Sequence, residues 1–432
     1  MLDEMRSAAR RVGSNRRLRS LLLACQRLLS ERGEANSLAI ARELLDGYAA
    51  LDDEGRGRFF AHLATDFNPD PKALLACAEA YARAPGAATL GALTAAAEPP
   101  RQEMLRRLNR LPGGTARIVA MRRALLLRLR EQPELAAAEA DFHHLLSSWF
   151  NPGFLQLQRV DWRSPAQLLE QLIRHEAVHA IDGWDDLRRR LQPDRRCFAF
   201  FHPQLPDEPL IFVEVALLPE MPPAIAPLIV KDDPPAPAQT FKVAAFYSIS
   251  NCQPGLKGVS LGNYLIKRVA EELQHELPQL KTFCTLSPVP GFARWLRSGA
   301  DLPGLGRTRA QRLAAALEAL RLHGGADLGA LAHASTLRRL PAEGQAALQQ
   351  LASMYLAWAS TTPVGDPVAR FHLDNGARLE RLNPMADLSA KGLRQSFGLM
   401  VNYLYDLKRI ERHHEKFVDG EIAYSRQIAS QL

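Results

Sequence analysis

The sequence has no apolar run as long as the roughly 18 residues that a membrane-spanning helix needs, which excludes a helical membrane protein. Its 5 cysteines are scattered at positions 25, 77, 197, 252 and 284. None forms a C-x-x-C pair, so we expect neither a zinc site nor a disulfide framework. The N-terminal residues also lack the apolar core of a signal peptide. Reduced cysteines without an export signal predict a cytoplasmic protein.

Neither sign of charge is in large excess, since the net charge is only +7 over 432 residues. Two arginine clusters, at 188–190 and 195–196, could meet phosphates. Such clusters are more typical of a solvated helical face. We therefore predict neither nucleic acid nor a membrane as a partner.

The length allows two or three domains, and two regions of the sequence differ in composition and in hydrophobic periodicity. Residues 1–150 are rich in Ala, Leu and Arg, with apolar residues at helical spacing, and predict an all-helical domain. Residues 151–432 predict an α+β domain with strands at 197–204, 209–218, 240–251, 282–286, 377–383 and 397–407. Helices are expected at 164–191 and 261–277, in an insertion at about 291–365, and in the tail from 408.

Ser287 follows a short apolar run, Thr282-Phe-Cys-Thr-Leu286, that reads as a buried strand. Pro288 ends the strand because it has no N–H for a ladder hydrogen bond, and Pro290-Gly291 predicts a turn. A hydroxyl is thus expected at the C-terminal end of a strand, where α/β sheets usually bind ligands. His372 lies in a second polar cluster, FHLDNGARLERLNPMADL. A serine and a histidine together suggest acid–base chemistry on an acyl group.

A glycine-rich loop, QPGLKGVSLG, joins the strand at 240–251 to the amphipathic helix at 261–277. Exposed N–H groups and the helix dipole favour anions at such a loop. Its spacing resembles the pyrophosphate motif of the GNAT acetyltransferases, with Lys and Ser substituted. The alternative is an ordinary helix N-terminus with flexible glycines. The predicted coenzyme A phosphate loop comprises Lys257, Gly258, Val259, Ser260, Gly262 and Asn263.

His175-Glu-Ala-Val-His179 matches H-E-x-x-H, which on a helix can bind zinc. The further ligands are missing, because Asp182 and Asp185 occupy the positions of the metzincin Gly and His. Strand-like sequence follows by 197, which leaves little room for the second helix of a gluzincin. We favour a structural helix with one His packed and one exposed, or His179 lining an acyl pocket, and predict no metal site.

Four segments resemble the malonyl-CoA decarboxylase family in the right order. They are DLRRRLQPDRRCFAFFHPQLPDEPLIFVEVAL, LKGVSLGNYLIKRVAEEL with TLSPVPGFARWL, and FHLDNGARLERLNPMADLSAKGLRQSFGLMVNYLYDL. The resemblance covers nearly the whole chain. It implies a helical N-terminal domain used in homo-oligomer contacts, followed by an acetyltransferase-like (GNAT) catalytic domain.

The resemblance also implies a reaction, malonyl-CoA to acetyl-CoA and CO₂, and its site residues. Ser287 in S-P-x-P-G-F, His372 in F-H-L-x-N-G-A and Tyr405 in N-Y-x-Y match the family's active-site positions. Ser260 departs from the pattern, since eukaryotic members carry Glu there. The chain ends Ser-Gln-Leu rather than in the S-K-L peroxisomal address, and we therefore expect a bacterial, cytoplasmic member.

The expected chemistry needs no metal or organic cofactor, because the thioester carbonyl itself accepts the electrons left by CO₂. Ser287 and His372 would stabilise and protonate the resulting enolate, and Tyr405 would assist. Each of these residues could instead have a purely structural role: Ser287 in a turn that ends a strand, His372 as the cap of a turn, and Tyr405 in the core. Two other functions stay open from the residues, an acetyl-CoA-dependent N-acyltransferase and a non-catalytic acyl-CoA-binding regulator.

Overall fold

The computed structural model describes residues 2–261, 265–302, 304–362 and 365–432. The chain forms two compact units, which we describe separately. The first unit contains residues 1–156, 201–209 and 253–261, and the second contains residues 157–200, 210–252 and 262–432. Two loops that follow strands of the second unit thus belong to the first.

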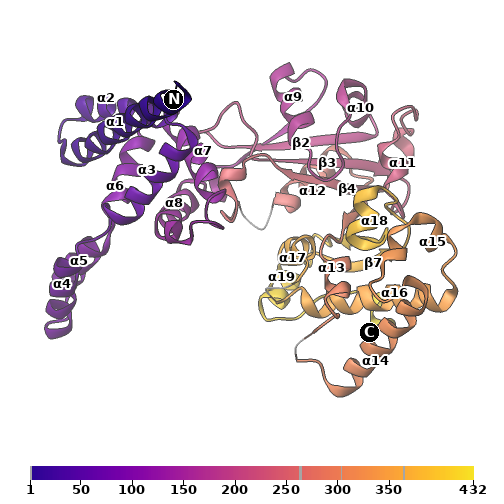
Figure 1. Ribbon diagram of the computed structural model, residues 1–432. Helices are drawn as coiled ribbons and strands as arrows, with labels where there is room; N and C mark the ends of the chain where they lie inside the picture. The colour runs from indigo at the N-terminus through magenta and orange to yellow at the C-terminus, as the bar shows by residue number, and fades with distance from the viewer. Residues whose placement is uncertain (1, 262–264, 303, 363–364) are drawn as a thin grey trace. The chain divides into compact units, whose positions relative to one another are not determined.

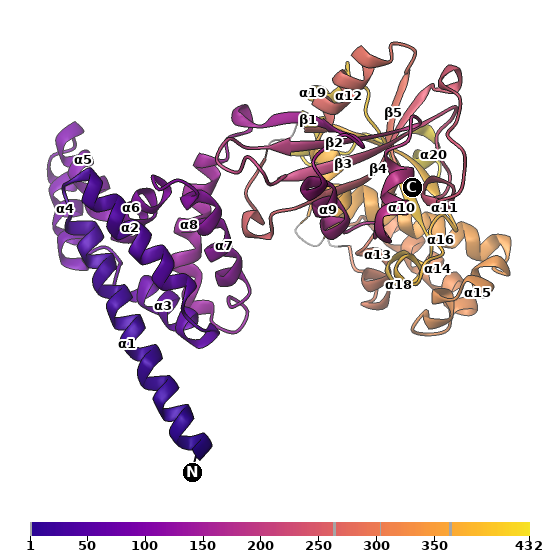
Figure 2. The same cartoon turned by 90° about the horizontal axis from the view of Figure 1, so that it is seen from above.

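The first unit is helical, as the sequence predicts for residues 1–150. Its helices are α1 (Leu2–Ser30), α2 (Glu34–Ala49), α3 (Asp53–Thr65), α4 (Pro71–Arg83), α5 (Ala87–Ala97), α6 (Pro100–Asn109), α7 (Gly114–Leu126) and α8 (Ala136–Trp149). The side chains of Asp52 and Asp70 cap α3 and α4 by accepting backbone N–H groups. The core contains Phe59, Phe60 and Phe142 among many leucines. Figure 2 shows the first turns of α1 running past the neighbouring helices of this unit.

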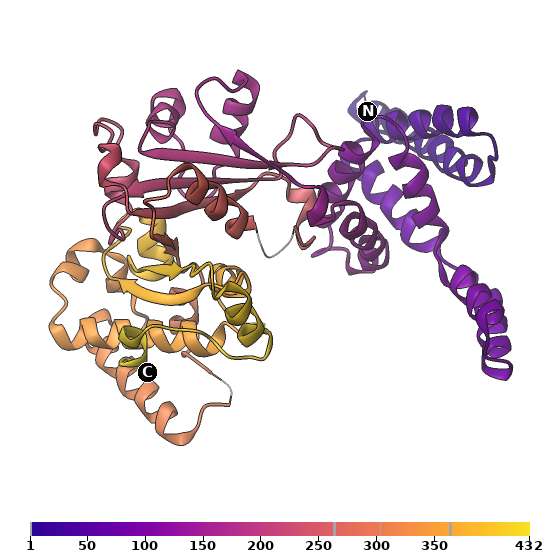
Figure 3. The same cartoon turned by 180° about the vertical axis from the view of Figure 1, so that it is seen from behind.

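Helices α4 and α5 form a hairpin that extends away from the other helices of the unit (Figures 1 and 3). Neither helix, both of which lie in the described residues, has a buried residue. Their sequences are nevertheless apolar, and Leu75 is 61% and Leu90 47% exposed. The hairpin therefore presents apolar surface that this unit leaves uncovered.

The second unit is built on a mixed sheet with the strand order β1-β2-β3-β4-β5-β8-β6, and β7 pairs with β8. The strands are β1 (Gln156–Val160), β2 (Arg195–Phe201), β3 (Ile211–Leu218), β4 (Val243–Asn251), β5 (Thr282–Thr285), β6 (Ser287–Pro288), β7 (Arg378–Asn383) and β8 (Met400–Leu404). Strands β2, β3 and β4 are antiparallel, whereas β4 and β5 run parallel. This mixed sheet confirms the predicted fold class, and the six predicted strands all form with small shifts of their ends.

Helices cover both sides of the sheet. Helices α9 (Ala166–His175) and α10 (Gly183–Arg190) lie on one side of β2–β4, and α12 (Leu265–Glu276) lies on the other (Figure 1). The apolar stripe expected on α12 is buried and includes Leu265, Val269 and Leu273. Across the described ranges we find no helix with the length and apolarity that a membrane crossing requires.

The remaining helices are α11 (Ala226–Ile229), which lies between β3 and β4 in the chain, and those of the predicted insertion and the C-terminal part. The latter are α13 (Phe292–Arg297), α14 (Arg307–Gly324), α15 (Ala334–Arg338), α16 (Ala342–Met354), α17 (Pro367–Asp374), α18 (Ala390–Ser396), α19 (Ile410–Val418) and α20 (Arg426–Ala429). A π-helical turn, Tyr355–Ala359, continues α16. The N–H groups at the start of α17 donate to the Asp366 carboxylate, which caps this helix.

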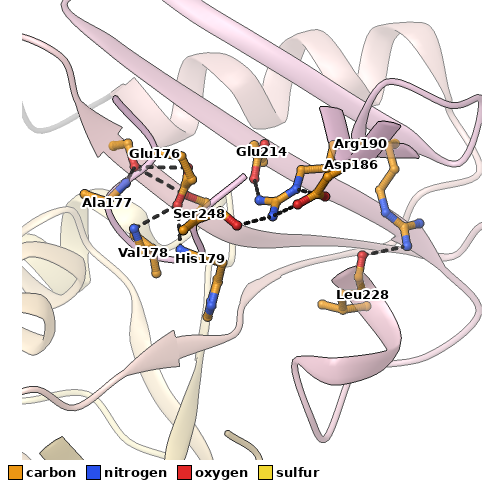
Figure 4. Close-up of polar contacts among 12 residues, drawn as sticks. Glu176, Ala177, Val178, His179, Asp186, Arg190, Glu214, Leu228 and Ser248 are labelled. Carbon is orange, nitrogen blue, oxygen red and sulfur yellow. Dashed lines mark hydrogen bonds and ion pairs between the residues drawn. The ribbon is translucent and has the colours of Figure 1, made fainter. Parts of the chain in front are cut away.

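Arg188 is exposed, but the other four arginines of the two clusters are buried and do not form the solvated face that we expected. Arg190 donates to Asp186 and Glu214 at 2.9 and 3.0 Å in a buried ion-pair network (Figure 4). Arg189 and Arg195 both pair with buried Asp194, and Arg196 pairs with Glu276. The prediction was wrong because Arg190 also pairs with Glu214, 24 residues away, and Arg196 pairs with Glu276, 80 residues away, and sequence spacing does not reveal these two partners. Paired in this way, the guanidinium groups can be buried.

Candidate active site

Ser287 and His372 are in direct contact although 85 residues separate them, with Ser287 Oγ 2.9 Å from His372 Nε2. Ser287 is the first residue of β6, one residue after β5, and Pro288, which we expected to end the strand, pairs with Met400 of β8. His372 lies in the last turn of α17. Both side chains are buried. The turn after α17 needs Gly376, whose φ of +77° is in the left-handed region that glycine tolerates.

A chain of hydrogen bonds continues on both sides of the pair. Tyr405 Oη lies 2.8 Å from His372 Nδ1, and Ser287 Oγ donates to Thr285 Oγ1 at 2.9 Å. Because Ser287 donates to Thr285, it accepts the Nε2 proton of His372, and Nδ1 then accepts from the Tyr405 hydroxyl. The donors therefore run from Tyr405 through His372 and Ser287 to Thr285.

Burial keeps His372 and Tyr405 neutral within this chain of hydrogen bonds. Desolvation lowers the pKa of His372 to about 3, and it raises the pKa of Tyr405 well above its usual value. The His372 ring also stacks on Tyr403, with 4.7 Å between ring centroids. At neutral pH the imidazole is thus an uncharged and tightly held group that can orient a hydroxyl.

A pocket of about 300 Å³ opens next to Ser287 and His372. It is lined by Val178, Ile211, Phe246, Tyr247, Ser248, Ile249, Asn251, Ser287, Pro288, Pro367, Val368, Phe371 and His372. Its walls are mainly apolar, and this lining contains no lysine or arginine. An anionic group that entered the pocket would meet mainly apolar side chains and no cationic side chain of this lining.

Strand β4 carries a bulge where it borders this pocket. Glu214 pairs with Ser248 and Val215 with Phe246, so Tyr247 is the extra residue. A bulge interrupts the ladder and frees main-chain groups to face a ligand. Tyr247 also lines the pocket.

Glu176 binds two residues that line the pocket, Val178 and Ser248, and explains why the H-E-x-x-H segment is not helical. Its carboxylate accepts from the backbone N–H groups of Val178 and His179 and from the Ser248 hydroxyl, at 2.7–2.8 Å (Figure 4). Ser250 Oγ also donates to it at 3.2 Å. Helix α9 therefore ends at His175, and the single helix that we expected over 164–191 was wrong.

The two histidines of the motif do not share a helical face. Val178, rather than His179, is the residue of this segment that lines the pocket. Among the described residues no group of three or more His, Cys, Asp or Glu side chains is arranged to hold a metal ion. Burial lowers the pKa of His179 to about 4.

The predicted phosphate loop is placed only in part. Gly262 and Asn263 lie outside the described residues. Lys257, Gly258, Val259 and Ser260 follow a 3-10 turn, Pro254–Leu256, and belong to the first unit. Gly258 has a φ of +82°, which favours glycine at this position. Its role in binding phosphates stays a prediction.

Sequence reasoning missed Thr285 and Glu176. Thr285 precedes Ser287 by two residues, so the alternation of a strand would have placed both hydroxyls on one face. Glu176 gave no such signal, since its partners Ser248 and Ser250 are more than 70 residues away.

A buried Ser–His pair beside a mostly apolar pocket is typical of enzymes that act on acyl groups. Comparison with known proteins defines the class further. Residues 153–432 match the malonyl-CoA decarboxylase C-terminal domain, and residues 67–150 match the malonyl-CoA decarboxylase N-terminal domain. The chain belongs to the malonyl-CoA decarboxylase family.

Individual relatives agree with this assignment. The mitochondrial malonyl-CoA decarboxylase of Mus musculus is 38% identical over 341 residues, which cover 75% of this chain and 69% of the relative. The crystal structure of malonyl-CoA decarboxylase from Rhodopseudomonas palustris is 48% identical, with a TM-score of 0.85 over 96% of this chain and 99% of that chain. The structure from Agrobacterium vitis is 46% identical, with a TM-score of 0.81 over 95% and 99% of the two chains.

Proposed function

We propose that this chain decarboxylates malonyl-CoA at the Ser287–His372 pair. The bond between Cα and the carboxylate breaks, CO₂ leaves, and its electron pair moves onto the thioester carbonyl as an enolate. Cα then takes up a proton to give acetyl-CoA. The hydrogen-bonded contact between Ser287 and His372 at the end of the pocket is the observation that carries this proposal.

The pocket favours loss of CO₂ because it offers the substrate carboxylate little solvation. The lining lacks a lysine or arginine, so the carboxylate is desolvated among apolar side chains. The enolate transition state spreads this charge toward the thioester oxygen, where donors are available. Charge that moves from an apolar wall toward fixed donors lowers the barrier.

Ser287 is the proposed donor to the enolate oxygen. Its proton points to Thr285, and rotation about one side-chain bond turns it toward the pocket. His372 holds the Ser287 oxygen, and Tyr405 fixes the tautomer of His372. The backbone at the Tyr247 bulge offers a second set of donors.

The proton that Cα gains passes through Ser287 and comes, in net terms, from water. Neither neighbour is a suitable net source, because the pKa of Tyr405 lies far above neutrality and His372 is already neutral. This mechanism requires no metal or organic cofactor, since the thioester is its own electron acceptor. Treatment with a chelator should leave the rate of CO₂ release unchanged.

Release of CO₂ from malonyl-CoA without any acceptor tests the proposal. We expect one CO₂ and one acetyl-CoA for each malonyl-CoA consumed. An enzyme that consumed the thioester only when an amine acceptor was added would be an acyltransferase, and the decarboxylase mechanism would be refuted.

The described part of the glycine loop, Lys257–Ser260, is the proposed contact for the coenzyme A phosphates. Backbone N–H groups of a glycine-rich turn and the Lys257 ammonium are both suited to phosphate oxygens. The supporting observation is the left-handed conformation of Gly258, which opens the turn.

A homo-oligomer formed through the helical unit is the proposed assembly, and the cytoplasm the proposed compartment. The uncovered hairpin of α4 and α5 supports the oligomer, because exposed leucines of this kind mark contact surfaces. All 5 cysteines are free, as a reducing compartment would keep them. Light scattering of the Leu75→Glu/Leu90→Glu variant should show a smaller assembly than the wild type, and an unchanged mass would refute the assignment of this surface.

A further inference from the structure

The glycine loop is packed directly against helix α7 of the helical unit. A Cβ atom added to Gly255 would lie 2.1 Å from the carbonyl oxygen of Val119, so any other residue would push the loop away. Gly255 is therefore needed for close approach of two backbones rather than for a phosphate. Its neighbours in sequence, Lys257 and Gly258, are the residues to which we assign phosphate contacts.

Arg122 of α7 fixes the start of the loop. Its side chain is 2% exposed, and Nη1 donates to the Gly255 carbonyl oxygen at 2.7 Å. Nη2 donates to Glu139 of α8 at 2.6 Å, which balances the buried charge. A buried guanidinium held at both ends is a rigid strut between two helices and the loop.

His143 of α8 makes a second contact three residues further along. Its Nε2 lies 3.1 Å from the Gly258 carbonyl oxygen and donates to it. That carbonyl belongs to the residue with the left-handed backbone, so the histidine supports the turn itself. Arg122 and His143 thus hold the loop at two points from outside the catalytic sheet.

We infer that Arg122 and His143 are positioning residues for the coenzyme A phosphates, and that the helical unit thereby takes part in substrate binding. This inference rests on the proposed function of the loop. The two side chains need not touch the substrate. They orient backbone N–H groups at Lys257–Ser260, and a loop displaced by about 1 Å can lose about 100-fold in rate.

Two substrates separate this role from a purely structural one. Malonyl-CoA carries the phosphates, whereas malonyl-pantetheine has the same thioester and acyl group without them. Turnover of each is measured as CO₂ release by the full-length wild type and by His143→Ala. The matched control is His144→Ala, which removes the adjacent, exposed histidine. A second variant, Arg122→Met/Glu139→Gln, removes the strut without leaving an unpaired acid.

We expect the KM for malonyl-CoA to rise about tenfold or more in His143→Ala and in the double variant, with kcat less affected. The kcat/KM for malonyl-pantetheine should stay within about twofold of the wild type. Equal losses with both substrates, or no loss with malonyl-CoA in His143→Ala, would overturn the inference. Failure of the proposed function would look different, because the wild type would then release no CO₂ from either thioester.

Discussion

Replacement of Ser287 by alanine removes the hydroxyl that we place against the enolate oxygen. Loss of one such donor typically costs about 10²–10³-fold in kcat, or about 3–4 kcal/mol of transition-state stabilisation. Binding of the thioester should change little, because the pocket walls and the phosphate loop are intact. We therefore expect a fall in kcat of at least about 100-fold with KM within about threefold of the wild type.

The same change also affects the folded state, and this must be separated from catalysis. Without Ser287, the His372 Nε2 proton and Thr285 lose a partner in a buried site, which costs about 1–3 kcal/mol. Ser396→Ala is a matched control, because Ser396 is a buried serine away from the pocket whose hydroxyl bonds the Leu399 carbonyl at 2.7 Å. Single-turnover assays with saturating malonyl-CoA, below the thermal transition of both variants, measure the chemical step. A Ser287→Ala enzyme with a kcat close to that of Ser396→Ala would refute the reasoning.

Further predictions concern the neighbours of Ser287. Tyr405→Phe frees the His372 tautomer, and kcat should fall about tenfold while CO₂ release stays coupled to acetyl-CoA; an unchanged kcat would remove Tyr405 from the mechanism. The unfolded chain protonates His372 near pH 6.5 but the folded chain only near 3, so this group stabilises the fold above pH 6.5 and the stability is lost as the pH falls. Urea unfolding at several pH values should show a smaller acid loss for His372→Gln; an equal loss would contradict the burial argument. Glu176→Gln should disorder the Val178 wall and lower kcat/KM about tenfold, with Glu170→Gln as an exposed control.

Much of the sheet follows from local sequence. Short apolar runs rich in β-branched and aromatic residues formed β3, β4 and β5 as predicted, because such residues fit a pleated, buried surface. This is a short-range effect, and a single sequence contains it. The expectation that Pro288 ends the ladder was wrong, because Ser287 and Pro288 form β6 and pair with Val401 and Met400 of β8.

The partners of Ser287 could not be derived from spacing. His372 lies in α17, and Tyr405 directly follows β8. The contact between Ser287 and His372 depends on how the insertion that separates these two residues packs. The residues alone left a turn cap for His372 and a core position for Tyr405 as alternatives. The family resemblance selected them, and the structure brings the three side chains into contact; their roles stay predictions.

Long-range hydrogen bonds also overrode one local expectation. The segment at 164–191 has helical periodicity, but the Glu176 carboxylate binds the N–H groups of Val178 and His179 together with two serines of β4, and the helix stops. The two serines lie more than 70 residues from Glu176 in the chain.

The most direct test is a crystal structure with a malonyl-CoA analogue that cannot lose CO₂. The account predicts the thioester oxygen within hydrogen-bonding distance of Ser287 Oγ, with His372 Nε2 still bound to that oxygen and the carboxylate among the apolar walls of the pocket. An acyl group bound elsewhere, or a carboxylate paired with a lysine or arginine, would contradict it.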